Sequence, residues 1–251
     1  MLACVAGVAS IGSACGRLGF EPRNGLPDAP PAVDAPPAMD APPAMIKWVK
    51  VFAEPRPLGT GPVDNFMANA QQRGNAVVLL VACAGSTMPT AVSVSAAGWS
   101  FDPLGPITGT AGEWAASFGA IAPDVSPTLF TVSWTGSGCD GARAELGDEF
   151  TNTDPAGGTV TFDMHTEAAG SGTAMAIVTT GNTNDAVWGA CVTSGTLTDV
   201  GVGYTKGADN STGDWSEYRI TADAAGTREQ VMFRNASANR YVLTTVTIKP
   251  R

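Results

Sequence analysis

Short runs in which apolar and polar residues alternate limit the fold of this chain more than any other feature. In one of them, Phe130, Val132 and Trp134 alternate with Thr131 and Ser133. A period of two places the apolar set on one face of a β-strand, whereas an amphipathic helix needs apolar residues three to four positions apart. Glycine, proline, asparagine and aspartate gather between the runs, as they do in turns. The pattern therefore predicts an all-β protein.

The second half of the chain continues the alternation. In Tyr241–Ile248 the apolar residues are expected to face the core, with Thr245 and Thr247 facing solvent. The segment Val200–Tyr204 alternates with glycine and is predicted as another strand. Long helical patterns are absent from the sequence. The best helix candidate is Asp64–Gln72, with the aspartate as N-cap, although a turn or loop fits this segment equally well.

Two runs lack the alternation, since Ala76–Cys83 and Ala186–Val192 are apolar at nearly every position. Such strands lie in the centre of a sheet that is covered on both faces, or at a contact between subunits. Together with the polar turns, the short strands predict an antiparallel β-sandwich of jelly-roll or immunoglobulin-like kind. The strand order does not follow from the sequence.

The N-terminal segment differs in composition from the rest of the chain. Residues 1–14 carry no charge and are fewer than the ~20 residues that a membrane-spanning helix needs, but they suit the apolar part of a secretory signal. A hexamer, D-A-P-P-A-V or D-A-P-P-A-M, repeats from Asp28 to Met45. Its prolines fix φ and remove N–H donors, which predicts a disordered, extended linker. The expected organisation is a signal peptide over 1–14, a linker over 15–45 and one β-sandwich domain over 46–251.

Gly12, Ser13 and Ala14 directly before Cys15 resemble the lipobox of bacterial lipoproteins. In that family the cysteine becomes the first residue after cleavage, and its thiol is diacylated. Gly16 at the following position implies sorting to the outer membrane. The resemblance therefore implies an exported outer-membrane lipoprotein anchored through Cys15, facing the periplasm or the cell surface. The alternative is an ordinary cleaved signal followed by an incidental cysteine.

The composition excludes several classes of protein. The chain has 44% hydrophobic residues, enough for a core, so disorder of the whole chain is excluded. Its net charge of −9 and its scattered lysines and arginines argue against a nucleic-acid partner. The single histidine excludes metal sites with several histidines. A membrane reached through the lipid, a glycan and an envelope protein remain as partners.

The order of several short motifs also resembles a group of uncharacterised bacterial surface β-sandwich domains. The motifs are VVLLVAC, a Gly-Trp-Ser-Phe turn, WAASFGA, LFTVSW, AELGDEF, DAVWGAC, VGVGYTKG, DWSEYR and YVLTTVTIK, and they extend from about Asn75 to Lys249. The resemblance implies a fold and a surface location. It implies no activity.

Three cysteines remain in the predicted domain. An exported protein meets an oxidising compartment, so one disulfide is expected and one thiol is left over. Cys83 and Cys191 each end an apolar run and are one candidate pair. Cys139, in a glycine-rich turn, pairs equally well with Cys83 on this reasoning.

The strongest pattern for ligand binding lies between positions 209 and 219. Trp215 falls beside charged residues, in phase with Glu217 and Arg219, and these three are the candidate ligand contacts. Calcium is the candidate cofactor, because oxygen-bearing side chains surround a glycine turn in the loose manner of a calcium loop. The candidate ligands are Asp209, Asp214 and Glu217, with Ser211. A hairpin turn explains the same residues.

Two acidic segments are candidates for hydrolysis. Asp163, His165 and Glu167 would share one face of a strand, as a row suited to acid–base chemistry or to a metal. A solvated polar face is the alternative. The second segment is Glu145, Asp148 and Glu149, which needs a partner carboxylate across a cleft and otherwise forms the acidic rim of an edge strand.

These observations lead to one functional hypothesis and one alternative. The hypothesis is an envelope-anchored, non-enzymatic β-sandwich that serves as a binding, adhesion or structural module for a glycan or a protein. The alternative is an extracytoplasmic hydrolase with an acidic site. No catalytic residue is assigned, because neither acidic segment forms a complete site in the sequence.

Overall fold

The computed structural model describes residues 44–53, 63–69, 71–84, 87–123, 129–136, 139, 143–210, 213–235 and 239–251. The predicted signal, Cys15 and nearly all of the predicted linker lie outside this part of the chain. Within it, antiparallel strands form four sheets, and the single helix, α1 (Gly158–Thr161), is one turn long. The expected all-β antiparallel sandwich is therefore confirmed.

The first half of the described chain forms one large and one small sheet. The large sheet has the order β1-β9-β3-β7-β5, with β6 also paired to β7, and the small sheet has the order β2-β8-β4. The strands are β1 (Lys47–Ala53), β2 (Val63–Met67), β3 (Ala76–Ala84), β4 (Ala91–Ser95), β5 (Asp102–Pro103), β6 (Thr108–Thr110), β7 (Glu113–Ile121), β8 (Leu129–Thr135) and β9 (Arg143–Thr151).

The second half repeats this arrangement. Its large sheet has the order β10-β17-β12-β15-β14, and its small sheet has the order β11-β16-β13. In both halves the first strand pairs with the last, and the second strand pairs with the last but one. This nested pairing is the winding of a jelly roll, not of an immunoglobulin domain. The strands are β10 (Phe162–Ser171), β11 (Ala174–Thr179), β12 (Ala186–Thr193), β13 (Leu197–Asp199), β14 (Thr205–Asp209), β15 (Trp215–Ile220), β16 (Arg228–Asn235) and β17 (Arg240–Ile248).

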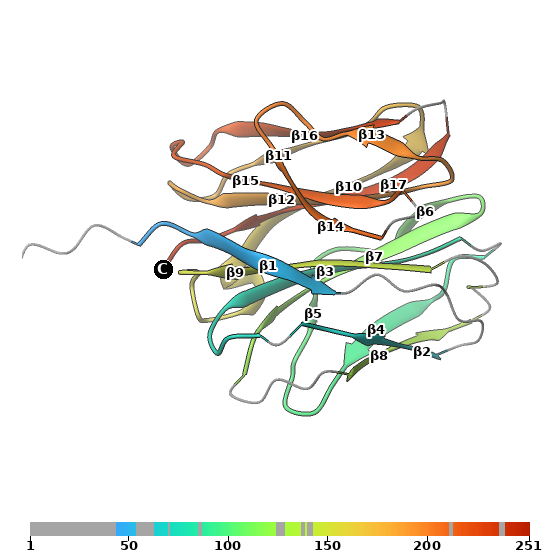
Figure 1. The fold of residues 1–251 in the computed structure, drawn as a ribbon, viewed down its shortest axis with the longest axis horizontal. Coiled ribbons are helices and arrows are strands. Elements are labelled where there is room, and N and C mark those ends of the chain that lie inside the picture. The colour runs from blue at the N-terminus through green and yellow to red at the C-terminus, as the bar shows by residue number, and fades with distance from the viewer. Residues whose placement is uncertain are drawn as a thin grey trace, which may run out of the picture. The chain divides into compact units, whose positions relative to one another are not determined.

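The four sheets stack as layers, with the two large sheets inside and the two small sheets outside (Figure 1). One core lies between the large sheets, and a further core lies between each large sheet and its own small sheet. The central strands β3 and β12 are therefore covered on both faces. This explains why Ala76–Cys83 and Ala186–Val192 are apolar throughout, and it requires no contact between subunits.

The contacts between the two jelly rolls are reciprocal: each strand that contacts the other jelly roll contacts the strand whose equivalent contacts its own equivalent. β1 contacts β14 as β10 contacts β6, β9 contacts β14 as β17 contacts β6, and β9 contacts β15 as β17 contacts β7. Such reciprocity is the property of a two-fold symmetric dimer. The described residues thus form one compact unit with the internal arrangement of a dimer.

Local structure repeats with the topology. Gly74 and Asn184 each lie two residues before the first residue of a central strand, β3 or β12. Both have positive φ, of 79° and 65°. In each half the carbonyl of the next residue accepts a hydrogen bond from the residue after the neighbouring strand, Ala122 or Thr221. The sequence around these positions is RGNAV in the first half and TNDAV in the second. The two halves can therefore be aligned residue by residue.

Three expectations about local structure are wrong. Asp64–Gln72 contains no helix in its described residues, because β2 pairs with β8 and buries Phe66 in the core. Val200–Tyr204 is a turn and not a strand, closed by the bond from the Tyr204 N–H to the Gly201 carbonyl. Thr245 and Thr247 are fully buried, because the small sheet covers the face of β17 that was expected to meet solvent.

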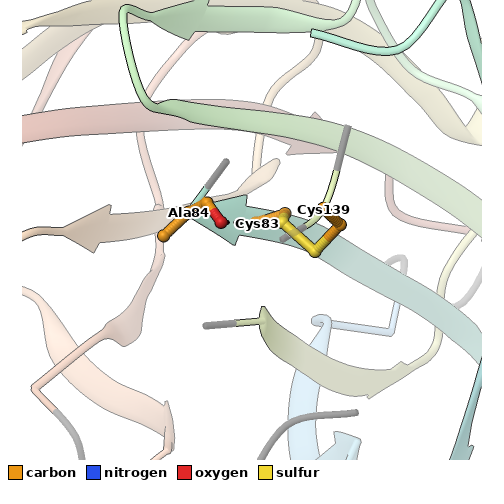
Figure 2. Close-up of a disulfide and its surroundings, with 3 residues drawn as sticks. All are labelled: Cys83, Ala84 and Cys139. Atoms are coloured by element: carbon orange, nitrogen blue, oxygen red, sulfur yellow. Dashed lines mark hydrogen bonds between the residues drawn. A yellow bond between two sulfur atoms is a disulfide. The ribbon is translucent and has the colours of Figure 1, made fainter. Parts of the chain in front are cut away.

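The cysteine pairing left open by the sequence is Cys83 with Cys139, as Figure 2 shows. Their Cα atoms lie 5.6 Å apart, within the range for a disulfide. The bond joins the end of β3 to the segment between β8 and β9. Cys191 is the free thiol and is fully buried in the core of the second jelly roll, where burial raises its pKa.

Candidate functional site

The three candidate ligand contacts Trp215, Glu217 and Arg219 do lie on one face of β15, the face toward the small sheet of the second jelly roll. Their surroundings differ along the strand. Trp215 packs against the core between these sheets and is half-buried. Glu217 is fully buried, and Arg219 reaches a cavity at the end of the sandwich. The alternation thus predicted the shared face, and of the three residues Arg219 is the one that lines this cavity.

Glu217 holds the backbone of two neighbouring segments. Its Oε2 accepts a hydrogen bond of 2.6 Å from the Gly201 N–H, and its Oε1 accepts one of 3.1 Å from the Met232 N–H. Burial raises the pKa of this carboxyl to about 7. The side chain is therefore occupied in joining the turn at Gly201 to β16, behind the wall of the cavity.

The candidate calcium ligands do not converge. Asp209 pairs with Lys206 at 2.6 Å, while Asp214 accepts hydrogen bonds from the Thr193 N–H and from Asn210. The Lys206 ammonium also lies 3.4 Å from the centroid of the Trp215 ring. Ser211 lies outside the described residues. Across the described part of the chain, no group of three or more histidine, cysteine, aspartate or glutamate side chains is placed to hold a metal ion.

The cavity beside Arg219 has a volume of about 470 Å³. The guanidinium donates one hydrogen bond of 2.7 Å to Glu229 and one of 3.4 Å to Asp223. Glu229 is buried, whereas Arg219 and Asp223 are half-exposed. The cavity therefore presents a fixed network of charged groups to solvent. Its lining consists of Val202, Tyr204, Arg219, Asp223, Thr227, Arg228, Glu229, Gln230 and Met232.

Tyr204 adds an unsatisfied polar group to this cavity. The residue is 9% exposed, and its hydroxyl is shielded from solvent and has no hydrogen-bond partner among the described residues. Burial raises the pKa of this hydroxyl, and the nearby Glu229 and Glu217 carboxylates raise it further, so the group stays protonated. A buried hydroxyl without a partner costs about 1–3 kcal/mol. A ligand that enters the cavity reaches this hydroxyl only if the side chains that cover it shift.

Sequence reasoning missed Tyr204, Asp223 and Glu229, because they come from a turn, a loop and a neighbouring strand. A signal for Tyr204 does exist in the sequence. It follows Gly203 as Trp99 follows Gly98, and both glycines have positive φ, of 84° and 79°. The repeated glycine–aromatic pair marks equivalent turns in the two halves.

The row Asp163, His165 and Glu167 is interrupted by a bulge between Phe162 and His165. Asp163 accepts hydrogen bonds from Asn182, at 2.7 Å, and from the Thr247 hydroxyl. The His165 Nε2 lies 3.9 Å from Glu167 Oε1, and burial raises the pKa of Glu167. The three side chains therefore do not form the continuous row that the alternation predicted.

A second cavity, of about 550 Å³, lies where the two jelly rolls meet beside β10. His165 and Asp163 line it together with Asp102 and Leu104 from the first jelly roll. The histidine thus shares the lining of this cavity with one carboxylate from each half, Asp102 and Asp163.

The acidic segment of β9 is not an edge rim, because β9 lies between β1 and β3. Glu145, Asp148 and Glu149 are all buried, so they form no open cleft. Glu149 accepts hydrogen bonds from the Gln72 N–H and from the Asn75 amide, at 2.9 and 2.7 Å. The segment therefore serves the interior of the fold.

Asp148 lies in the core between the two jelly rolls. Its carboxylate accepts hydrogen bonds of 2.8 Å from the indoles of Trp48, on β1, and Trp188, on β12. Ser216, on β15, donates a further hydrogen bond to it. Burial raises the pKa of Asp148. One carboxylate of the first half thus binds two strands of the second half, which fixes how the large sheets stack.

Several buried carboxyls share raised pKa values because burial disfavours their charged form. The pKa of Glu113 rises from 4.5 to about 7, opposed by the charge of Arg240. The pKa of Glu217 also rises to about 7, and that of Asp185 rises from 3.8 to about 6. The folded protein therefore binds these protons more tightly than the unfolded chain.

We expect the stability of the protein to fall as the pH rises from about 4 to about 7. A pKa raised on folding gives stability that is complete below the unfolded pKa and is lost as the pH passes the folded value. For Glu113, a rise from 4.5 to about 7 corresponds to roughly 3 kcal/mol. Melting temperatures at pH 5 and pH 8 measure the effect, with the higher value expected at pH 5.

The variant Glu113→Gln serves as the control for this pH dependence, because it removes one of the titrating groups. Its melting temperature should change less between pH 5 and pH 8 than that of the wild-type protein. Asp154, whose pKa is lowered by the Ala156 N–H and by Lys249, acts in the opposite direction only below its ordinary value of 3.8. A wild-type melting temperature that rises from pH 5 to pH 8 would contradict the assignment.

Comparison of the chain with protein-family models, with curated proteins and with solved structures finds no match. Among the residues described, no helix has the length and apolar character needed to cross a membrane.

Proposed function

We propose that this chain is a non-enzymatic binding module that engages a glycan or protein ligand through the Arg219 cavity. The observation that carries the proposal is the convergence of Arg219, Asp223 and Glu229 around a cavity that is also lined by Tyr204, whose buried hydroxyl has no partner among the described residues. Binding sites commonly combine a concave shape with a few fixed polar groups.

The position of the cavity supports a binding role. Its walls come from the turn at Val202 and Tyr204, the end of β15, the loop that contains Asp223, and the start of β16. Connecting segments at the end of a rigid sandwich commonly carry binding function, because they tolerate variation that the sheets do not. The ion pairs with Arg219 hold the side chains in place before a ligand arrives, which lowers the entropic cost of binding.

Anchoring belongs to the same proposal. We propose that Cys15 carries a lipid and that the segment up to Met45 is a tether that holds the jelly rolls away from the outer membrane, on the periplasmic side or at the cell surface. The uncharged first segment, the lipobox-like residues and the repeated D-A-P-P-A hexamer support this. Metabolic labelling with a fatty-acid probe should label the protein, and Cys15→Ala should remove the label. Equal labelling of both forms would refute the anchor.

Binding is tested with the full chain on a glycan array and against a displayed-peptide library. We expect Arg219→Ala to weaken binding of any ligand found by at least tenfold, because it removes the donor that organises both carboxylates. The matched control is Arg234→Ala, which removes an exposed arginine of β16 that pairs with Asp199 outside the cavity. Equal loss of binding in both variants, or no loss in Arg219→Ala, would reject the cavity as the site.

A hydrolase remains the second candidate function, and the cavity at His165 is the observation that favours it. A histidine beside carboxylates can act in general acid–base catalysis. Hydrolysis of chromogenic glycosides or esters by the wild-type chain, lost in His165→Ala and retained in Arg219→Ala, would favour this alternative over the binding module.

A further inference from the structure

The alignment of the two jelly rolls shows what the first half has in place of the Arg219 cavity. In the first large sheet Ala76 pairs with Ile121, and in the second Ala186 pairs with Ile220. Counting back one residue along each strand makes Ala120 the counterpart of Arg219. Counting nine residues forward from Ile121 and from Ile220, across connections of equal length, makes Phe130 the counterpart of Glu229.

The third equivalence concerns the turn that precedes the cavity. Trp99 donates its N–H to the Ala96 carbonyl as Tyr204 donates its N–H to the Gly201 carbonyl. Each aromatic residue follows a glycine in the left-handed region. Trp99 is therefore the counterpart of Tyr204, so alanine, phenylalanine and tryptophan stand where the second half has arginine, glutamate and tyrosine.

Aromatic rings fill this place in the first jelly roll. Phe130 packs edge-on against Trp99 with ring centroids 5.1 Å apart, and against Phe52 at 5.2 Å. Phe66 stacks on Phe130 at 5.2 Å, and Phe101 completes the cluster. Apart from the indole N–H of Trp99, which is buried without a partner in the described part of the chain, this interior is apolar. The polar groups of the second half are not needed to close a jelly roll of this kind.

At the equivalent position the second jelly roll has a buried group that lowers its stability. Glu229 is 4% exposed, and burial raises its pKa. Among the residues described, the Tyr204 hydroxyl lacks a partner, as the indole N–H of Trp99 does in the first jelly roll, so the two halves differ in the buried carboxyl. A buried carboxyl destabilises a fold relative to packed rings. Residues that lower stability where a packed alternative exists are characteristic of sites kept for function.

We infer that the Arg219 cavity is a site for an uncharged saccharide unit, present in the second jelly roll alone. The inference rests on the proposed function and names its ligand class. Two cations, Arg219 and Arg228, and two anions, Asp223 and Glu229, line the cavity, so their formal charges cancel. A charged ligand group would have to compete with the existing pairs of Arg219.

Hydroxyl groups suit this lining better than charges do. Each hydroxyl both donates and accepts, so it can bind a carboxylate oxygen, a guanidinium N–H or the Tyr204 hydroxyl without breaking the ion pairs. Met232 and the 84% exposed Val202 give the cavity an apolar side. A sugar ring presents hydroxyls at its rim and C–H groups on its face, which matches both features.

The test transplants the first half's residues into the second. The double variant Arg219→Ala, Glu229→Phe should lose binding to uncharged glycans on the array by at least tenfold, while its melting temperature equals or exceeds that of the wild-type protein. Tyr204→Phe, which deletes one hydroxyl, should weaken binding up to about tenfold. Raising NaCl from about 0.1 to 1 M should leave the affinity nearly unchanged, because the ligand carries no charge.

The outcomes separate the inference from the proposed function. The saccharide inference is overturned if the ligand is a peptide, or if it binds only when it carries a carboxylate, sulfate or amine. If the double variant loses binding to such a ligand, the proposed function still stands. Glycan binding that persists in the double variant overturns both. An array and peptide library that yield no ligand for the wild-type chain also overturn both. If the double variant does not fold, the salt dependence and Tyr204→Phe decide the ligand class alone.

Discussion

Asp148→Ala should lower the free energy of unfolding by roughly 3–5 kcal/mol, because it leaves two indole N–H groups and a serine hydroxyl without an acceptor. Trp48, Trp188 and Ser216 all donate to this carboxylate, and Asp148 is fully buried between the jelly rolls. Trp188 and Ser216 are fully buried and cannot reach water without separating the large sheets, whereas Trp48 is half-buried. Urea unfolding followed by tryptophan fluorescence measures the loss.

The control is Asp199→Ala, which removes an aspartate that is exposed and pairs with Arg234 at 3.9 Å. It should change stability by no more than about 0.5 kcal/mol. A double-mutant cycle of Asp148→Ala with Trp188→Phe sharpens the test, because the two residues share a hydrogen bond and their effects should not add. Additive effects, or a loss below about 1 kcal/mol for Asp148→Ala, would mean that this carboxylate does not hold the halves together.

Loss of the Cys83–Cys139 disulfide should have an effect of similar size. The bond closes a loop with a sequence separation of 56 residues, which corresponds to about 4 kcal/mol in the chain-entropy account. The variant Cys83→Ser, Cys139→Ser should therefore melt roughly 10 °C below the wild-type protein. Removing only one of the two cysteines would leave a reactive thiol, so the double variant is the cleaner measurement.

Cys191→Ala is the matched variant for the disulfide, since it removes the free buried thiol. It tests connectivity, because a disulfide map by mass spectrometry should show the same Cys83–Cys139 peptide pair in this variant as in the wild-type chain. A peptide pair that joins Cys83 to Cys191 would contradict the pairing. Similar melting temperatures of the oxidised wild-type protein and the Cys83→Ser, Cys139→Ser variant would contradict the expected stabilisation.

Part of the candidate site was accessible to sequence reasoning. The alternation along β15 placed Arg219 on the same face as Trp215 and Glu217, as the structure has it. Alternation does not predict how deeply a side chain is buried, because a period of two assigns residues to a face without showing what covers that face. Glu217 is buried under the small sheet and binds backbone N–H groups, while Arg219 two residues later lies at the open end.

The duplication also had a trace in the sequence. RGNAV and TNDAV precede the central strands, and a glycine followed by an aromatic residue recurs as Gly98–Trp99 and Gly203–Tyr204. These matches are short because only turns impose strict requirements on residue type, such as the positive φ of the glycines. Strand residues vary freely as long as the cores stay filled, so the two halves have diverged elsewhere.

The sequence by itself determined that the chain is built from antiparallel strands, that Ala76–Cys83 and Ala186–Val192 are covered on both faces, and that Phe130, Val132 and Trp134 share the buried face of their strand. These follow from local periodicity and from the free energy of burying apolar surface, which are properties of neighbouring residues. Only the tertiary structure decided the jelly-roll order, the stacking of two jelly rolls, the cysteine pair and the cavity at Arg219. Each of these depends on contacts between residues far apart in the chain, and period-two patterns are the same whichever strands become neighbours.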